Sequence, residues 1–378
     1  MKTYRKENDM NQICCVIFAS IVLSLATTNE QLMDKLEMHE VQDTIDEILE
    51  ENTIDIKQTI MDMLKGKIPF DMKDIIDMIL SRLFSGIVQN RDIFIHILLF
   101  AVAGAIFHNF SEAFRNTQIS EIGFYIIYML LLAVLVKSFS SIAQIASIGV
   151  ENLLDFMRAL LPSYFLAITF SGGTVSSMVF YEIVLFIITA VEWLLKNLVI
   201  PMIHIYVVLV LVNDLLKEDT LSKLAELIKN IVEWLLKTLL AAVIGINIVQ
   251  GMISPVIDSF KTGIFAKTAS MLPGLGNVVN AATEVVLGAG ILIKNGIGVA
   301  ALIIIAFICI IPFVNIIVVT VIYQLSAAVI QPISDKRIVK SLTGIGTGAR
   351  LLSKVVLTAG VMFLLTIAII TVSTNFRT

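Results

Sequence analysis

An apolar run over Ile297–Val321 contains no charged residue and most constrains how this chain folds. A helix of about 20 apolar residues crosses the hydrocarbon core of a bilayer. Hydrophobic residues make up 57% of the chain, charged residues only 15%, and the mean hydropathy is +0.90. Soluble domains carry about 25% charged residues. The sequence therefore predicts an all-α, polytopic helical membrane protein.

The N-terminal 26 residues combine a basic start with a short apolar core. Lys2, Arg5 and Lys6 precede the apolar or small residues 13–26, and Ser24 and Ala26 suit the −3 and −1 positions of a cleavage site. Residues 1–26 are either a signal peptide or an uncleaved N-terminal anchor. The three cysteines, Cys14, Cys15 and Cys309, all lie in apolar segments, so the sequence suggests neither disulfides nor a zinc site.

Residues 27–90 form an acidic region with helical periodicity. Apolar residues recur at helical spacing from Leu32 to Leu49, and a second amphipathic pattern covers residues 71–84. Basic residues concentrate in cytoplasmic loops, so the acidity predicts an extracytoplasmic location. The region either packs on itself or on the membrane surface, or it offers a docking surface to a partner across the membrane.

Residues 91–378 form the predicted polytopic domain, with seven to nine crossings. Residues 137–158 are predicted as an amphipathic connector. The loop around 335–354 holds five basic residues against Asp335, which places it in the cytoplasm. The candidate spans are Ile93–Phe110, Ile122–Val136, Leu160–Phe170, Val175–Leu195, Leu198–Val212, Leu239–Ile253, Ile297–Leu325 and Val355–Val372.

The hexapeptide VEWLLK occurs at 191–196 and at 232–237, and its two copies hold both tryptophans of the chain. Indole rings sit at headgroup level and lysines reach for water, so each copy predicts a membrane boundary. The second copy closes Leu221–Lys237, whose leucines and isoleucines form one helical stripe. This segment is predicted to lie along the cytoplasmic interface without crossing it.

A different internal repeat is indicated by the prolines. Pro162 falls on Pro273 and Pro201 on Pro312 under one shift of 111 residues, and the chain has only seven prolines. This register predicts two related halves at about 151–260 and 261–378. Internal repeats are a recurrent feature of membrane transporters.

In each predicted half, helix-breaking residues interrupt the apolar sequence. Such breaks persist in a membrane where protein or a water-filled cavity satisfies the freed backbone groups, or where small residues allow close helix packing. Both interpretations stay open, and Pro162 and Pro273 are predicted to begin discontinuous segments. The candidate pathway or packing breaks are Pro162, Gly172, Gly173, Pro201, Pro273, Gly274, Gly276, Gly288, Gly290 and Pro312.

Ionisable residues inside apolar runs are costly in a bilayer and usually functional. Glu182 and Glu284 are the best candidates for facing a cavity, whereas Glu192 lies beside Trp193 and Lys196 at a predicted interface. His96, His108 and His204 are interpreted as capped or interfacial, and Lys294 is a further charge in such a run. No catalytic, cofactor or metal-ligand pattern is visible, so an enzyme is not expected.

Five long segments of the polytopic region are distinctive: LLPSYFLAITFSGGTVSS (160–177), VEWLLKNLVIPMIHIYVVL (191–209), LSKLAELIKNIVEWLLK (221–237), SMLPGLGNVVNAATEVVLGAG (270–290) and KSLTGIGTGARLLSKVVLTAG (340–360). Together with the signal-like segment and the acidic region, they resemble the stage III sporulation protein AE family of endospore-forming Firmicutes. The likeness extends over nearly the whole chain.

The resemblance implies a subunit of a channel or secretion-like complex in the mother-cell membrane around the forespore, needed for late forespore gene expression. It implies a cytoplasmic ATPase, ring-forming proteins of the same operon and a forespore membrane protein as partners. The lipid bilayer is a partner as well, and nucleic acid is not expected. From the residues alone, an autonomous secondary transporter for a small solute remains the alternative.

Overall fold

The computed structural model describes residues 36, 38–49, 54–67, 72–113, 117–171, 174–216, 219–269 and 276–374. Within these ranges every regular element is helical, which confirms the predicted all-α fold. The segment 1–26 lies outside the described residues. In chain order the elements are α2 (His39–Leu49), α3 (Ile56–Leu64), α4 (Met72–Gln89), α5 (Arg91–Ala113), α6 (Thr117–Phe170), α7 (Thr174–Leu194), the π-helical turn η1 (Leu195–Val199), α8 (Ile200–Leu215), α9 (Ser222–Ala269), α10 (Gly276–Ile330) and α11 (Lys336–Ser373).

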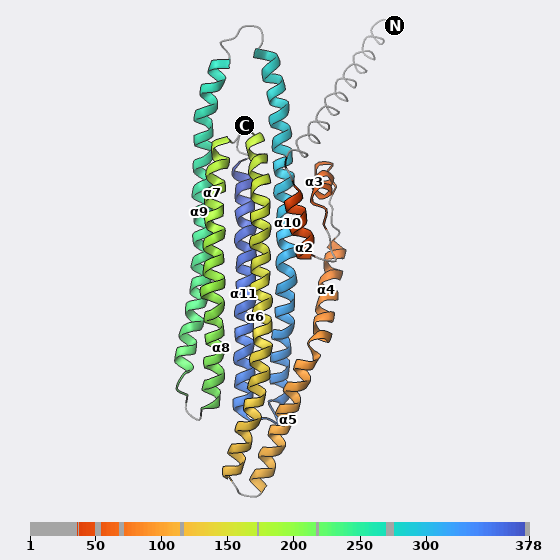
Figure 1. The fold of residues 1–378 in the computed structure, drawn as a ribbon, viewed down its shortest axis with the longest axis vertical. Helices are drawn as coiled ribbons and strands as arrows, with labels where there is room; N and C mark the ends of the chain where they lie inside the picture. The colour runs from red at the N-terminus through yellow and green to blue at the C-terminus, as the bar shows by residue number, and fades with distance from the viewer. Residues whose placement is uncertain are drawn as a thin grey trace, which may run out of the picture.

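The long helices form an elongated antiparallel bundle (Figure 1). α11 lies inside it and packs against α6, α8, α9 and α10. One end, at the bottom of Figure 1, carries the connections 216–221 and 331–335, and we call it the basic end; the opposite end is the far end. Five helices are long and apolar enough to cross a membrane: Ile122–Phe170, Ser177–Leu215, Ser222–Met252, Leu287–Ile330 and Lys336–Ser373.

The prediction of seven to nine crossings is wrong for the described residues. They contain five such helices, or up to six if α4 and α5, bent by 41° against each other, form one span. The predicted spans at 122–136 and 160–170 belong to the single helix α6, and the predicted connector 137–158 is part of that helix. The predicted spans at 175–195 and 198–212 form one rod, because η1 joins α7 directly to α8.

The segment 221–237 does not form a separate interfacial helix, so this prediction is wrong. α9 runs unbroken from Ser222 to Ala269, parallel to its neighbours (Figure 1). No proline interrupts LLKTLLAAV (235–243), so nothing ends the helix after the second VEWLLK copy. The apolar positions Ala225, Val232 and Leu236 are buried in the bundle. The same apolar periodicity therefore fits a helix packed along the bundle axis and a helix lying on a membrane surface.

Two of the predicted breaks lie inside unbroken helices. Pro162 is within α6 and Pro312 within α10, so Pro162 does not begin a discontinuous segment. Pro201 lies in the first turn of α8, directly after η1, where a missing backbone donor is tolerated. Pro273 and Gly274, like Gly172 and Gly173, lie outside the described residues. The 111-residue duplication stays a prediction.

The remaining glycines among the candidate breaks, Gly276, Gly288 and Gly290, lie in α10, which begins at Gly276. A Cβ added to Gly290 would lie 2.7 Å from the backbone carbonyl carbon of Phe170 and 2.9 Å from the nitrogen of Ser171. A Cβ on Gly288 would meet nothing within 4 Å. Gly290 therefore lets α10 approach the end of α6, as small residues do between membrane helices.

The N-terminal helices cover one side of the bundle toward the far end. α2 packs on α6, and α3 on α10. Val41, Ile45, Ile56 and Ile60 are fully buried there, and the hydroxyl of Ser163 donates to the backbone carbonyl of Leu36 at 2.7 Å. The outer face of α2 exposes the acidic residues Glu40, Asp43, Asp46 and Glu47.

Candidate functional site

A polar groove of about 480 Å³ opens between α8, α9 and α11 at the basic end. Its walls carry both carboxylates and amines, together with hydroxyl and amide groups, although these helices are otherwise strongly apolar. The lining residues are Tyr206, Val210, Asn213, Asp214, Asp219, Ser222, Ala225, Glu226, Lys229, Val339, Lys340, Thr343, Gly344 and Thr347.

Asp214, in the last turn of α8, is the most enclosed acid of the groove, with 7% of its surface exposed. The Ser341 hydroxyl donates to Asp214 Oδ2 at 3.0 Å and lies 2.7 Å from the hydroxyl of Tyr128. The Tyr128 hydroxyl also donates to the backbone carbonyl of Leu211 at 2.8 Å. This network joins α6, α8 and α11, and through Ser341 it gives the buried carboxylate of Asp214 a hydrogen-bond donor.

The connection 216–221 is held against the groove by Asn213. Its amide nitrogen donates to Asp219 Oδ1 at 2.8 Å, and its amide oxygen accepts from the backbone nitrogen of Leu221 at 2.7 Å. Hydrogen bonds from Asn213 and then Ser222 lower the pKa of Asp219, so this carboxylate is ionised at neutral pH. Asn213 thereby fixes the start of α9 and the acidic rim of the groove.

From the groove a polar stripe continues along α11 toward the far end. Every exposed residue of α11 from Lys336 to Lys354 is polar, whereas the exposed ones beyond it are Leu357, Leu365 and Val372. α9 borders the stripe with Glu226, Lys229 and Glu233, and Lys354 pairs with Glu233 at 2.7 Å. We define the stripe as Lys340, Thr343, Thr347, Arg350 and Lys354 of α11 with Glu226, Lys229 and Glu233 of α9.

The opposite flank of the same part of α9 is apolar. Leu224, Leu227, Ile231 and Trp234 are exposed there, at the spacing of one helix face. Glu226, Lys229 and Glu233 therefore lie on the side of α9 that meets the groove and α11. Lys223, Asn230 and Lys237 are exposed between this side and the apolar flank, which suits lipid.

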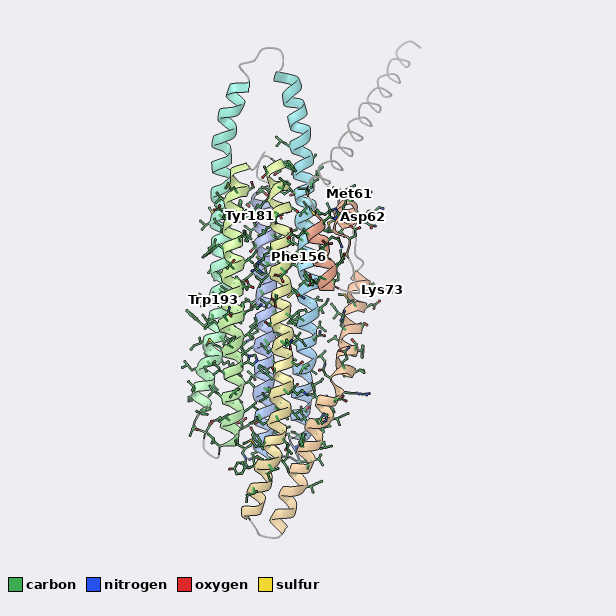
Figure 2. The ribbon with its side chains drawn as sticks, in the orientation of Figure 1. Met61, Asp62, Lys73, Phe156, Tyr181 and Trp193 are labelled. Carbon is green, nitrogen blue, oxygen red and sulfur yellow. The ribbon has the colours of Figure 1, made fainter. Side chains whose placement is uncertain are left out.

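A belt of ion pairs and tryptophans marks the upper limit of the stripe. Lys196 pairs with Glu151 at 3.0 Å, and Arg158 contacts both Glu192 and Asp155. Trp193 and Trp234 are 61% and 62% exposed, and Trp193 lies about halfway along the bundle (Figure 2). We define the belt as these pairs, the Glu233–Lys354 pair and the two tryptophans. Tryptophans beside charged side chains are typical of a membrane interface, and the membrane boundaries predicted at the VEWLLK copies stay a prediction.

The predicted intramembrane charges do not gather at the groove. Glu182 is exposed on α7, and the side chain of Glu284 lies outside the described residues, as does that of His108. The Nδ1 atoms of His96 and His204 contact backbone carbonyl oxygens of their own helices. Lys294 is fully buried in α10, where its ammonium donates to Thr374 Oγ1 at 2.8 Å.

The stripe was not predicted from the sequence, although its residues recur with a helical period. Lys336, Lys340, Thr343, Thr347, Arg350 and Lys354 recur every three or four residues, which places them on one face of a helix. Taking residues 335–354 as a loop hid this periodicity. Asp214 gave no such signal, because only the fold brings Ser341 and Tyr128 to it.

Replacing Ser341 by alanine is expected to destabilise the bundle by about 1–3 kcal/mol, because Asp214 loses a hydrogen-bond donor in a buried site. The measurement is the apparent melting temperature of the purified protein in detergent. Ser353→Ala is the matched control: this buried hydroxyl of α11 bonds only to the carbonyl of Arg350 in its own helix. Equal melting temperatures for the two variants would contradict a bridging role for Ser341.

Among the described residues, no cluster of three or more His, Cys, Asp or Glu side chains could hold a metal ion. The groove therefore presents hydrogen-bonding and ionic groups to whatever enters it. It combines a buried acid, exposed lysines and threonine hydroxyls.

Comparison with known proteins places this arrangement in a family. The chain is 25% identical over 321 residues to the stage III sporulation protein AE of Bacillus subtilis (strain 168), covering 84% of this chain and 80% of that protein. No solved structure matches. The profile of the family described as stage III sporulation protein AE matches residues 54–374, which contain α3 to α11, the groove and the stripe. This multi-pass membrane protein therefore belongs to the stage III sporulation protein AE family.

Proposed function

We propose that the chain is a membrane-embedded, non-enzymatic subunit of a channel complex that links mother cell and forespore and sustains late forespore gene expression. Its place is the mother-cell membrane around the forespore. The proposed partners are a cytoplasmic ATPase, ring-forming proteins and a forespore membrane protein. Family membership supports the sporulation role.

The length of the apolar exterior is the observation that carries the proposal of a subunit in a complex. The segment Ser177–Leu215 has 39 residues, so it is about 58 Å long at 1.5 Å per residue. A bilayer core is about 30 Å thick. Yet large apolar side chains are exposed near both ends of this rod, with Met178 and Phe186 at one and Ile205 and Val208 at the other. One bilayer cannot cover all of them, so we infer that other proteins cover the remainder.

The packed interior of the bundle also supports a subunit of a complex. One continuous hydrophobic cluster fills the described bundle and includes Tyr128 and Leu131 toward the basic end and Ile168 and Ile370 toward the far end. A path for solutes is therefore more readily built along the outside of this chain, against other subunits, than through its middle. An autonomous transporter would need its own gated site inside the bundle.

Affinity purification of the tagged chain from sporulating cells tests the proposal. We expect co-purification of an ATPase and further membrane proteins, with each recovered reciprocally when the partner carries the tag. The same tag on an unrelated multi-pass membrane protein expressed at the same stage is the control. Recovery of the chain alone, together with solute uptake by liposomes containing only this protein, would replace the proposal by the transporter alternative.

A further inference from the structure

Three features at different heights along the bundle place the bilayer: the basic start of α11, the belt and the acidic N-terminal helices. Lys336 begins α11 at the basic end, and Lys354 lies in the belt 18 residues later, about 27 Å along the helix. This distance matches a bilayer core of about 30 Å. Basic residues favour the cytoplasmic side, and tryptophans with lysines favour an interface. The core of the bilayer therefore fits between the basic end and the belt.

The acidic N-terminal helices agree with this placement. Figure 2 places Met61 and Asp62 of α3 nearer the far end than Trp193. The exposed acids of α2 belong to the same side of the belt, because α2 is anchored through Leu36 to Ser163, beyond Arg158 on α6. A bilayer around that part of the bundle would bury these carboxylates in lipid at high cost.

Within the fitted layer, α8, α9 and α10 expose apolar residues that suit lipid, whereas the stripe and a shorter row on α6, Lys137, Ser140 and Gln144, are polar. Val208 of α8, Leu227 of α9 and Leu325 of α10 are exposed and apolar. On the stripe, Lys340 lies four residues, about 6 Å, from Lys336, and Arg350 and Lys229 lie equally far from the Glu233–Lys354 pair. Thr343 and Thr347 lie nearer the middle of the layer. A cation costs roughly 2.5–3.5 kcal/mol at the centre of a lipid-exposed helix and less near a boundary, where its side chain can reach water. Eight polar side chains on one flank therefore indicate that this flank faces water.

We propose that the stripe is one wall of a water-filled path across the membrane that takes small anionic solutes. The inference rests on the proposed function, since further subunits of the complex supply the other walls. The polar groove at the basic end is the cytoplasmic mouth of the path. Its floor is set by the Asp214–Ser341 pair and its rim by Asp219 and Lys340.

The preference for anions follows from which charges remain uncompensated above the groove. Glu233 is paired with Lys354, and Glu226 with Lys223 at 3.0 Å. Lys229 and Lys340 line the groove together with the acids Asp214, Asp219 and Glu226. With Lys354 paired to Glu233, the remaining charge of the stripe above the groove is the cation Arg350. Arg350 donates to Thr347 Oγ1 at 3.2 Å, which holds its guanidinium along the stripe. Rings and rows of Lys and Arg select anions in pores.

Cysteine accessibility in membranes prepared from lysed sporulating cells, where an impermeant reagent reaches both faces, tests the water-filled path. The background is the full chain with Cys14, Cys15 and Cys309 replaced by serine or alanine, and the probe is a charged, membrane-impermeant methanethiosulfonate. We expect Thr343→Cys and Thr347→Cys to be modified. Leu224→Cys and Leu227→Cys are the matched controls on the outer flank of α9. They lie nine and six residues before Glu233, and the two threonines lie 11 and seven residues before its partner Lys354. The two control cysteines should stay unmodified.

Any other pattern of modification among these four cysteine variants overturns the proposal. Modification of all four positions would place this half of the bundle in bulk water, and modification of none would show a stripe sealed by lipid or protein. Lys340→Cys, at the mouth, provides a second position if a threonine variant fails to accumulate. The labelling result does not depend on whether partners co-purify with the chain. If no partner co-purifies but the expected cysteines are modified, the channel complex is refuted and the water-exposed stripe still stands.

The anion preference has its own readout at Thr347→Cys. Relative to their rates with a free thiol, a negatively charged methanethiosulfonate should react at least about tenfold faster than a positively charged one, because clefts lined by one sign of charge concentrate counter-ions. Adding Arg350→Gln should reduce this ratio, whereas Lys65→Gln, a charge change on an exposed residue of the N-terminal region, should leave it unchanged. A ratio near one in the parent would overturn the assignment to anions.

Discussion

Gly290→Ala is expected to deplete the protein from the membrane, whereas Gly288→Ala, two residues earlier on the same helix, should accumulate normally. At Gly290 the new methyl group would lie 2.7 Å from the carbonyl carbon and oxygen of Phe170. Backbone atoms at the end of a helix cannot rotate away as a side chain would, so α10 and α6 must separate. Overpacking of this kind costs about 1–3 kcal/mol and occasionally more.

Gly288 is a close control because it lies in α10 near Gly290 and no atom comes within 4 Å of an added Cβ. Replacing a mid-helix glycine by alanine even favours the helix by roughly 1 kcal/mol. The measurements are membrane abundance by immunoblot and melting temperature in detergent. Similar abundance and stability for both variants would contradict the close approach of α10 to Phe170, and a normal Gly290→Ala protein that fails in sporulation would revive the pathway interpretation of this glycine.

The helical class could be read from the sequence because apolar runs such as Ile297–Val321 leave few alternatives in a bilayer. The ends of the helices could not be read from the sequence. Pro162 and Pro312 look like breaks, but each costs only local hydrogen bonds, and the surrounding helices continue through them. The turn η1 joins two predicted spans through an arrangement of hydrogen bonds that no residue pattern announces.

The surroundings of an amphipathic helix could not be predicted from the sequence either. The periodicity of 221–237 fits a helix on a membrane surface, and it also fits α9 standing upright with a core face, a polar flank and an apolar flank. Only the neighbours decide: Lys354 of α11 meets Glu233, and α8 covers the other side. The stripe of α11 could have been found from its spacing alone, whereas Asp214 depends on residues up to 127 positions away.

The second large effect is expected at Lys294, which is fully buried in α10. Its ammonium donates to Oγ1 of Thr374, the C-cap residue of α11. The last carbonyls of a helix carry a partial negative charge, which a buried cation stabilises. The C-terminus of the central helix is thus held by a charge of the correct sign on its neighbour.

Lys294→Glu should therefore destabilise the protein by on the order of 3–5 kcal/mol, since a buried carboxylate would face the negative end of α11. Lys294→Met keeps most of the aliphatic volume and removes the charge, and such replacements of buried charges are often close to neutral. Lys65→Glu is the same charge change at the exposed C-cap of α3 and should cost no more than about 1 kcal/mol, because water screens the helix end there. The readouts are membrane abundance and melting temperature in detergent. If Met and Glu at 294 reduce stability equally, the sign of the charge is irrelevant, and the lysine acts through its hydrogen bond to Thr374 instead of through the helix end.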